Sequence, residues 1–221
     1  YNAIKIGDYE AAISHLERTV DLDTSIGRPV DGVTVVNNIV SMLAQAGATD
    51  VAQRLLPTHA QLSARSGAPA NLFFSNLLCA RVNFLAHDYV RALSCADSGR
   101  NNAAAPAEYM TRLMTYRVHA LARLGRGHDA RHAMNALREL AASRGDPSLN
   151  ERLDGIEPEV LRAEGRLAEA FAAMRDVYES SQQSVMSRFN DGVKEMRATM
   201  ESEVAEAEAR VEAQAVRVEL Q

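Results

Sequence analysis

The sequence predicts an all-α protein: a solenoid of helical hairpins followed by a long C-terminal coiled-coil helix. Three observations carry this prediction. The composition favours helix, a short Gly/Ala signature recurs along the chain, and the last part of the sequence has no proline. Aromatic residues make up only 5% of the 221 residues and tryptophan is absent. Ala, Leu, Arg and Glu dominate instead, as is typical of helical proteins.

A glycine or histidine five residues before an alanine marks each repeat. The segments are GDYEAA, GATDVA, HDYVRA, GRGHDA and GRLAEA, with marker alanines Ala12, Ala52, Ala92, Ala130 and Ala170. Successive markers are 40, 40, 38 and 40 residues apart, a period typical of helical solenoids. The glycine permits a positive φ between two antiparallel helices, and the small alanine lets their backbones approach closely.

Apolar periodicity and breaks at Gly and Pro set the expected elements. Helices are predicted at residues 1–6, 8–22, 30–46, 49–65, 70–86, 88–101, 106–124, 128–144, 150–164 and from 167 onward. The breaks DTSIGRP, SGAP, NNAAAP and SRGDPS mark repeat boundaries, where proline suits the first turn of the next helix. We expect a repeat array over residues 1–178 and a dimerisation helix over residues 179–221.

The opening stretch KIGDYEAAISHLE resembles the tetratricopeptide repeat (TPR). The matching residues are Gly7, Asp8, Tyr9, Ala12, Ile13, Leu16 and Leu22. Later units keep the Gly and the Ala but lengthen the loops, and His87 replaces the Gly of the third unit. The resemblance implies a concave groove, lined by the first helix of each pair, that binds a peptide or protein ligand.

The resemblance also implies candidate side chains in this groove, obtained by carrying the groove positions of the TPR family over by register from the marker alanines. They are Thr34, Asn37, Ser41 and Gln45 in the second unit, Arg81 in the third, and Arg112, Tyr116, His119 and Arg123 in the fourth. Amides pair with main-chain atoms and guanidinium groups match carboxylates, so these residues suit a peptide or acidic ligand. The alternative is a solvated polar face without a ligand. In the third unit the same register puts Asn76 and Asn83 at packing positions.

The final helix is predicted to run from Leu167 for about 54 residues, which is roughly 80 Å. Its apolar residues are Val185, Phe189, Val193, Met196, Met200, Val204, Ala207, Val211, Ala215 and Val218. They are spaced 4, 4 and 3 in turn, an eleven-residue repeat. Such a narrow seam needs a partner helix, so we predict a parallel homodimer through it. The alternative is a solvated helix stabilised by local charge pairs. Nearer its start, Ala170, Phe171 and Met174 are expected to pack on the preceding helix.

Charge and hydropathy argue against nucleic acid and a membrane as partners of this chain. The net charge is −5, and residues 176–221 account for all of it with ten acidic and five basic side chains. No basic stripe suits nucleic acid, and no apolar window reaches the length of a membrane span. We expect a cytoplasmic protein, with periplasmic sensing left open.

Cys79 and Cys95 are interpreted as two buried thiols.

No catalytic residue, cofactor or metal site is predicted for this chain. HDARH places His128 and His132 one helical turn apart beside Asp129, but the further ligands of a known metal motif do not follow. Motifs for phosphate binding or for a serine or cysteine nucleophile are not found in the sequence.

The order of repeats followed by a coiled coil resembles the sensory half of bacterial signalling proteins in which TPRs precede a GGDEF diguanylate cyclase or, less often, a histidine kinase. This resemblance implies that ligand binding in the array passes through the coiled coil to an output domain. The GGDEF motif itself is not in the sequence. One alternative is a TPR scaffold or adaptor that binds a protein or peptide without enzymatic output. Another is a peptide receptor in which groove binding opens the array.

Overall fold

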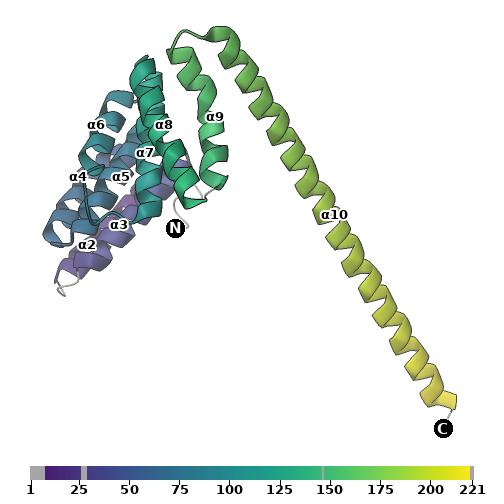
Figure 1. Cartoon of the computed structure of the whole chain (residues 1–221). Helices are drawn as coiled ribbons and strands as arrows, with labels where there is room; N and C mark the ends of the chain where they lie inside the picture. Colours follow the sequence, from purple (N-terminus) through teal and green to yellow (C-terminus); the bar gives the residue numbers. More distant parts are fainter. Residues whose placement is uncertain (1–7, 26–28, 146, 220–221) are drawn as a thin grey trace. The chain divides into compact units, whose positions relative to one another are not determined.

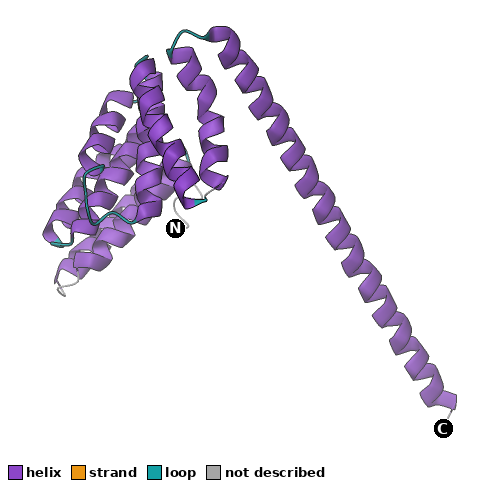
Figure 2. Ribbon diagram, in the orientation of Figure 1, coloured by secondary structure: helices purple, strands orange, loops and turns teal. Residues whose placement is uncertain are grey.

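The computed structural model describes residues 8–25, 29–145 and 147–219, and these ranges contain helices and turns but no strand (Figure 1 and Figure 2). The helices are α2 (Tyr9–Ser25), α3 (Pro29–Gln45), α4 (Thr49–Arg65), α5 (Pro69–Leu85), α6 (Tyr89–Gly99), α7 (Ala107–Arg123), α8 (Gly127–Arg144), α9 (Pro147–Ala163) and α10 (Leu167–Glu219). The all-α class is confirmed. The predicted helix at residues 1–6 lies outside the described residues.

Helices from α2 to α9 form a solenoid of hairpins. Each helix packs on the next in the chain, and α3, α5, α7 and α9 also contact one another in that order. These four, the first helices of their hairpins, therefore share one side of the array. The arrangement is compatible with a TPR-like fold. The predicted helix 49–65 coincides with α4, and the other described ends differ by three residues or fewer.

The turns inside the hairpins share one backbone geometry. Positive φ values occur at Gly47 (83°), His87 (60°), Gly125 (73°) and Gly165 (79°). After α3, the Ala48 N–H donates to the Leu43 carbonyl at 2.9 Å and the Gly47 N–H to that of Ala44 at 3.3 Å. This pair of bonds is the Schellman motif, and it recurs at the other three turns. The predicted positive φ is confirmed at these glycines; Gly7 lies outside the described residues.

The Asp-Tyr pair of the first and third repeats starts a helix in both cases. The Asp8 carboxylate accepts from the Ala11 N–H at 3.1 Å, and the Asp88 carboxylate accepts from the Arg91 N–H at 3.1 Å. Both aspartates therefore satisfy backbone donors that the first helical turn leaves unpaired. The tyrosines that follow them pack against the hydrophobic core.

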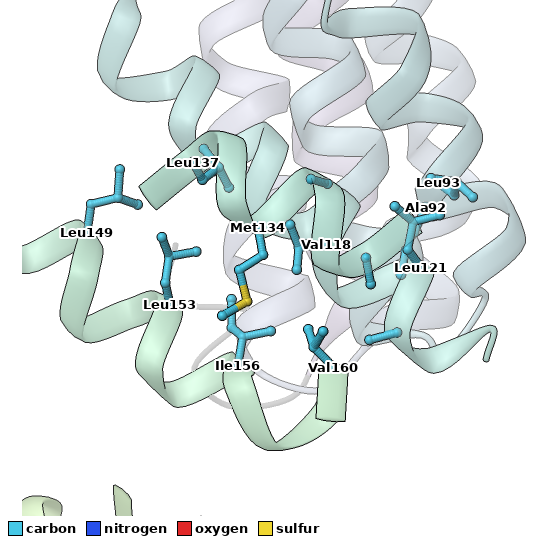
Figure 3. Packing of buried hydrophobic residues seen from close by; sticks show 14 of the residues in the cluster. Ala92, Leu93, Val118, Leu121, Met134, Leu137, Leu149, Leu153, Ile156 and Val160 are labelled. Carbon is cyan, nitrogen blue, oxygen red and sulfur yellow. The ribbon is translucent and has the colours of Figure 1, made fainter. Parts of the chain in front are cut away.

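Marker alanines allow the close helix approach that the repeat predicts. Ala52, Ala92 and Ala130 are fully buried and Ala170 is nearly so. In the cluster of Figure 3, Met134 of α8 extends toward Leu153 and Ile156 of α9. A second helix thus packs on the first helix of the following hairpin, which is how a solenoid builds a continuous core.

The interpretation of Cys79 and Cys95 as free thiols is wrong. They form a disulfide that joins α5 to α6, with their Cα atoms 5.9 Å apart. Asn83 donates to the Cys79 carbonyl at 2.9 Å and accepts from Gln53 of α4 at 2.9 Å. Asn83 is thus buried at the packing position that the register gave it, with its amide paired.

Two compact units divide the chain, residues 1–171 and 172–221. The division falls within α10, as does the boundary that the sequence predicts at residue 178. The expected packing of Phe171 on the preceding helix is wrong, because its side chain is 66% exposed. Met174 lies in the second unit, so its expected packing stays a prediction. None of the described helices combines the length and apolar character needed to cross a bilayer.

Candidate functional site

A cavity of about 670 Å³ lies on the side of the array that the first helices share. Its lining comprises Asn37, Ser41 and Gln45 of α3, Phe74, Leu77, Leu78 and Arg81 of α5, Tyr109, Arg112, Thr115, Tyr116 and His119 of α7, and Arg152 and Ile156 of α9. Every one of these residues belongs to a first helix. The volume is typical of a ligand pocket.

Most of the groove residues predicted from the sequence meet at this cavity. Asn37, Ser41, Gln45, Arg81, Arg112, Tyr116 and His119 line it. Thr34 and Arg123 are not part of the lining. On α7 the spacing of Arg112, Tyr116 and His119 places them on one helical face.

Sequence reasoning missed the contribution of the last hairpin. Arg152 and Ile156 lie 40 residues after Arg112 and Tyr116, one full repeat along the chain. Extending the register by one period would have found both. Tyr109 and Phe74 were also missed, and their rings pack edge to face with centroids 5.0 Å apart.

Arg123 is held in an ion pair with Glu159 of α9. Arg123 Nε donates to Glu159 Oε2 at 3.1 Å, a second guanidinium nitrogen contacts Oε1, and His119 Nδ1 lies 3.1 Å from Oε2. Burial alone would raise the pKa of Glu159, but the hydrogen bonds from His119 and Arg123 hold it below its ordinary value. These contacts join α7 to α9, so Arg123 has a structural partner.

Three arginines of the cavity have no such partner. Among the described side chains, no carboxylate lies within ion-pair distance of Arg81, Arg112 or Arg152, and the lining includes no acidic residue. Elsewhere in the array arginines pair across helices, as Arg117 does with Asp97 at 2.7 Å. The cavity therefore presents an excess of positive charge on three consecutive first helices, which favours an anionic ligand.

Two tyrosines, Tyr109 and Tyr116, line the cavity together with these arginines. The Arg112 guanidinium lies over the Tyr109 ring, 5.2 Å from its centroid, a cation–π contact that orients the arginine. Burial raises the pKa of Tyr116, although Arg81 and Arg112 oppose that shift. The Tyr116 phenol therefore stays protonated at neutral pH and can donate a hydrogen bond to an acceptor in the cavity.

His128 and His132 of the HDARH segment do not line this cavity. His128 is exposed, and its Nδ1 is 3.9 Å from Asp129. In the described part of the chain, no group of three or more His, Cys, Asp or Glu side chains is arranged to hold a metal ion.

The predicted dimer seam on α10 is exposed in the single chain. Its large members are Val185, Phe189, Val193, Met196, Met200 and Val204, with exposed fractions between 41% and 65%. The side chains of Val211 and Val218 lie outside the described part. Exposed apolar stripes of this kind are typical of helices that pair with another helix.

The cavity and the seam are thus two separate surfaces with different chemistry, one cationic and concave, the other apolar and narrow. No family profile, curated protein or solved structure matches this chain.

Proposed function

We propose that this chain is the sensory and dimerisation region of a bacterial signalling protein. The array binds an acidic peptide or protein segment in the cavity, and a parallel pair of α10 helices carries the signal to an output domain, a diguanylate cyclase or, less often, a histidine kinase. The observation that carries the proposal is the row of arginines without a carboxylate partner among the described side chains, Arg81, Arg112 and Arg152, on three adjacent first helices.

An anionic ligand in this cavity would bridge several repeats. A carboxylate bound by Arg81 and Arg152 together links α5 to α9, so binding favours the array curvature that brings these arginines to the ligand. A two-stranded coiled coil suits signalling to a diguanylate cyclase, because cyclases that follow such repeats need two catalytic domains facing each other. Ligand binding and dimer geometry are thereby coupled in one chain.

The disulfide between Cys79 and Cys95 supports the periplasmic alternative for the location of the array. Disulfides persist in oxidising compartments and are rare in the cytoplasm. Alkylation of free thiols in intact cells, followed by mass measurement of the isolated protein, tests this. Two alkylated cysteines would place the array in a reducing compartment.

Fluorescence anisotropy with labelled hexaglutamate tests the cavity. We expect Arg81→Ala and Arg112→Ala each to weaken binding about tenfold, roughly 1.4 kcal/mol, because each removes a charge-assisted contact. Their melting temperatures should stay close to that of the wild type, since neither arginine has a carboxylate partner. Arg65→Ala, at an exposed position of α4, is the matched control. Unchanged affinity in Arg112→Ala, or binding lost equally in Arg65→Ala, contradicts the assignment.

Replacement of seam residues tests the dimer. Light scattering is expected to show a dimer for the wild type and a monomer for the triple variant Val193→Glu, Met200→Glu and Val204→Glu, because unpaired carboxylates in a dry interface cost several kcal/mol. Ala198→Glu with Ser202→Glu places two added carboxylates on the opposite face and should leave the dimer intact. A wild-type monomer at high micromolar concentration would remove dimerisation from the proposal.

A further inference from the structure

Four more apolar side chains are exposed on α10 before the predicted seam begins. They are Leu167, Phe171, Met174 and Tyr178, with exposed fractions between 55% and 66%. Their spacing is 4, 3 and 4 residues, and steps of 4 and 3 through Gln182 lead on to Val185. The stripe therefore continues without a break from Leu167 to Val204 along one face of a single helix.

Equivalent residues of the earlier hairpins are covered. One residue after the marker alanine, Leu93 is buried and Gln53 and Arg131 are half-buried. Four residues after it, Ala96 and Met134 are buried and Leu56 is half-buried. Phe171 and Met174 hold these two positions after Ala170, and both are exposed. Within the described residues no further first helix follows α10, so these packing side chains need a cover from elsewhere.

We propose that a second copy of this chain supplies the cover, so that the two-helix interface begins at Leu167 instead of at Val185. This inference rests on the parallel homodimer of the proposed function. Continuity of the stripe is the first argument, because the same face that pairs with a second copy beyond Val185 extends to the first residue of the helix. From Leu167 to Val204 the stripe is about 56 Å long, roughly twice the length from Val185 to Val204.

The single polar residue of the stripe is compatible with pairing to a second copy of the same helix. Gln182 is the one polar side chain in the stripe between Leu167 and Val204, and it donates to the Tyr178 hydroxyl at 2.9 Å. In a parallel pair Gln182 meets Gln182 of the second copy. An amide pair of this kind can satisfy both members, and it opposes shifted registers in which the amide would face an apolar side chain.

Charges beside the stripe are paired within the helix. Arg175 lies 3.8 Å from Glu179, and Arg197 lies 2.8 Å from Glu201. Lys194 lies 3.4 Å from Asp191. At these three places, two identical helices side by side bring together flanks of mixed sign.

Photo-crosslinking of the full chain tests where the interface begins. Benzoylphenylalanine replaces Phe171 in one variant and Phe189 in another, and both substitutions keep an aromatic side chain. A third variant carries it at exposed Ser180, on the opposite face of α10. We expect a covalent dimer from the first two variants, at least tenfold more than from the Ser180 variant, with crosslinks to residues 167–178 of the second copy for the Phe171 probe.

The outcomes separate this inference from the dimer itself. Covalent dimer from Phe189 alone means that the interface begins further along α10, which overturns the inference and keeps the homodimer. Absence of dimer from both positions removes the homodimer as well. A crosslink from position 171 to its own chain also overturns the inference. In a second measurement, Phe171→Ala with Met174→Ala should raise the dissociation constant of the dimer at least tenfold with unchanged helix content, and an unchanged constant contradicts the proposal.

Discussion

Gly127 stands where the first turn of α8 meets the end of α9. A Cβ built at this position lies 2.6 Å from the Ala163 carbonyl oxygen, a backbone atom that cannot move aside. Gly155 in the interior of α9 has no such neighbour within 4 Å. The same residue type therefore has opposite roles at the two positions.

We expect Gly127→Ala to lower the free energy of unfolding by about 1–3 kcal/mol, the usual cost of overpacking. Gly155→Ala should raise it by about 0.5–1 kcal/mol, because alanine is the better helix former. Urea denaturation of both variants measures the difference. Equal effects of the two substitutions would show that α8 and α9 do not approach closely at Gly127.

His59 makes the array sensitive to acid. The side chain is fully buried, and in the described structure neither ring nitrogen has a hydrogen-bond partner. Burial lowers the pKa of His59 to about 4, whereas an unfolded chain has a histidine pKa of about 6.5. The unfolded state therefore takes up the proton first, and stability present above pH 6.5 is lost as the pH falls toward 4.

Between pH 7 and pH 5 this histidine should remove about 2 kcal/mol from the free energy of unfolding. His59→Leu, which cannot titrate, should show a correspondingly smaller loss over the same range. Urea denaturation at both pH values compares the two proteins. Parallel pH profiles for wild type and variant would mean that His59 is solvated or paired.

At the scale of the element, the hairpin α5–α6 shows that the positions of two cysteines relative to a turn can predict a disulfide. Cys79 and Cys95 are each eight residues from His87, the positive-φ residue of the turn. In an antiparallel pair, residues equally far from the turn lie at the same height, so the two side chains face each other. Their separation matches no metal or redox motif, and sequence analysis therefore missed the pairing. Symmetry about the turn was the available signal.

Loss of this crosslink should destabilise the array by about 3 kcal/mol, the value expected for a loop of about 15 residues in the chain-entropy account. Cys79→Ser with Cys95→Ser should melt at a lower temperature than the oxidised wild type. Added reductant should lower the wild-type melting temperature toward that of the variant and leave the variant unchanged. A wild type insensitive to reductant would contradict a structural disulfide.

Helices, turns and the groove register could be predicted because they depend on short-range patterns. His87 was placed correctly because the turn requires one residue with positive φ, a conformation that histidine tolerates at some cost. The ion pair of Arg123 with Glu159 could not be predicted, because it depends on how far α7 and α9 approach. Phe171 was misplaced because an apolar face indicates that a helix is covered but does not indicate which surface covers it.

At the scale of the whole molecule, the phase of α10 is the variable that the proposed signalling mechanism requires. Four residues inserted after Ser184 would rotate the downstream part of the helix by about 40° relative to the upstream part, whereas eleven complete three turns of an eleven-residue repeat. If the chain is joined to the proposed output domain, we expect the first insertion to alter output activity and the second to preserve most of it. Equal activity in both would show that the helix acts only as a tether.

The cavity is lined by α3, α5, α7 and α9, so its width depends on the three successive rotations that relate these helices. A ligand that contacts both Gln45 and Arg152 therefore measures the pitch of the solenoid across more than one hundred residues of sequence. By reciprocity, any force that stretches or bends the array changes ligand affinity by the same coupling free energy with which the ligand resists that force. The stiffness of the array against stretching should therefore increase with ligand concentration. Pulling on the two ends of the array at increasing ligand concentration would measure that stiffness directly.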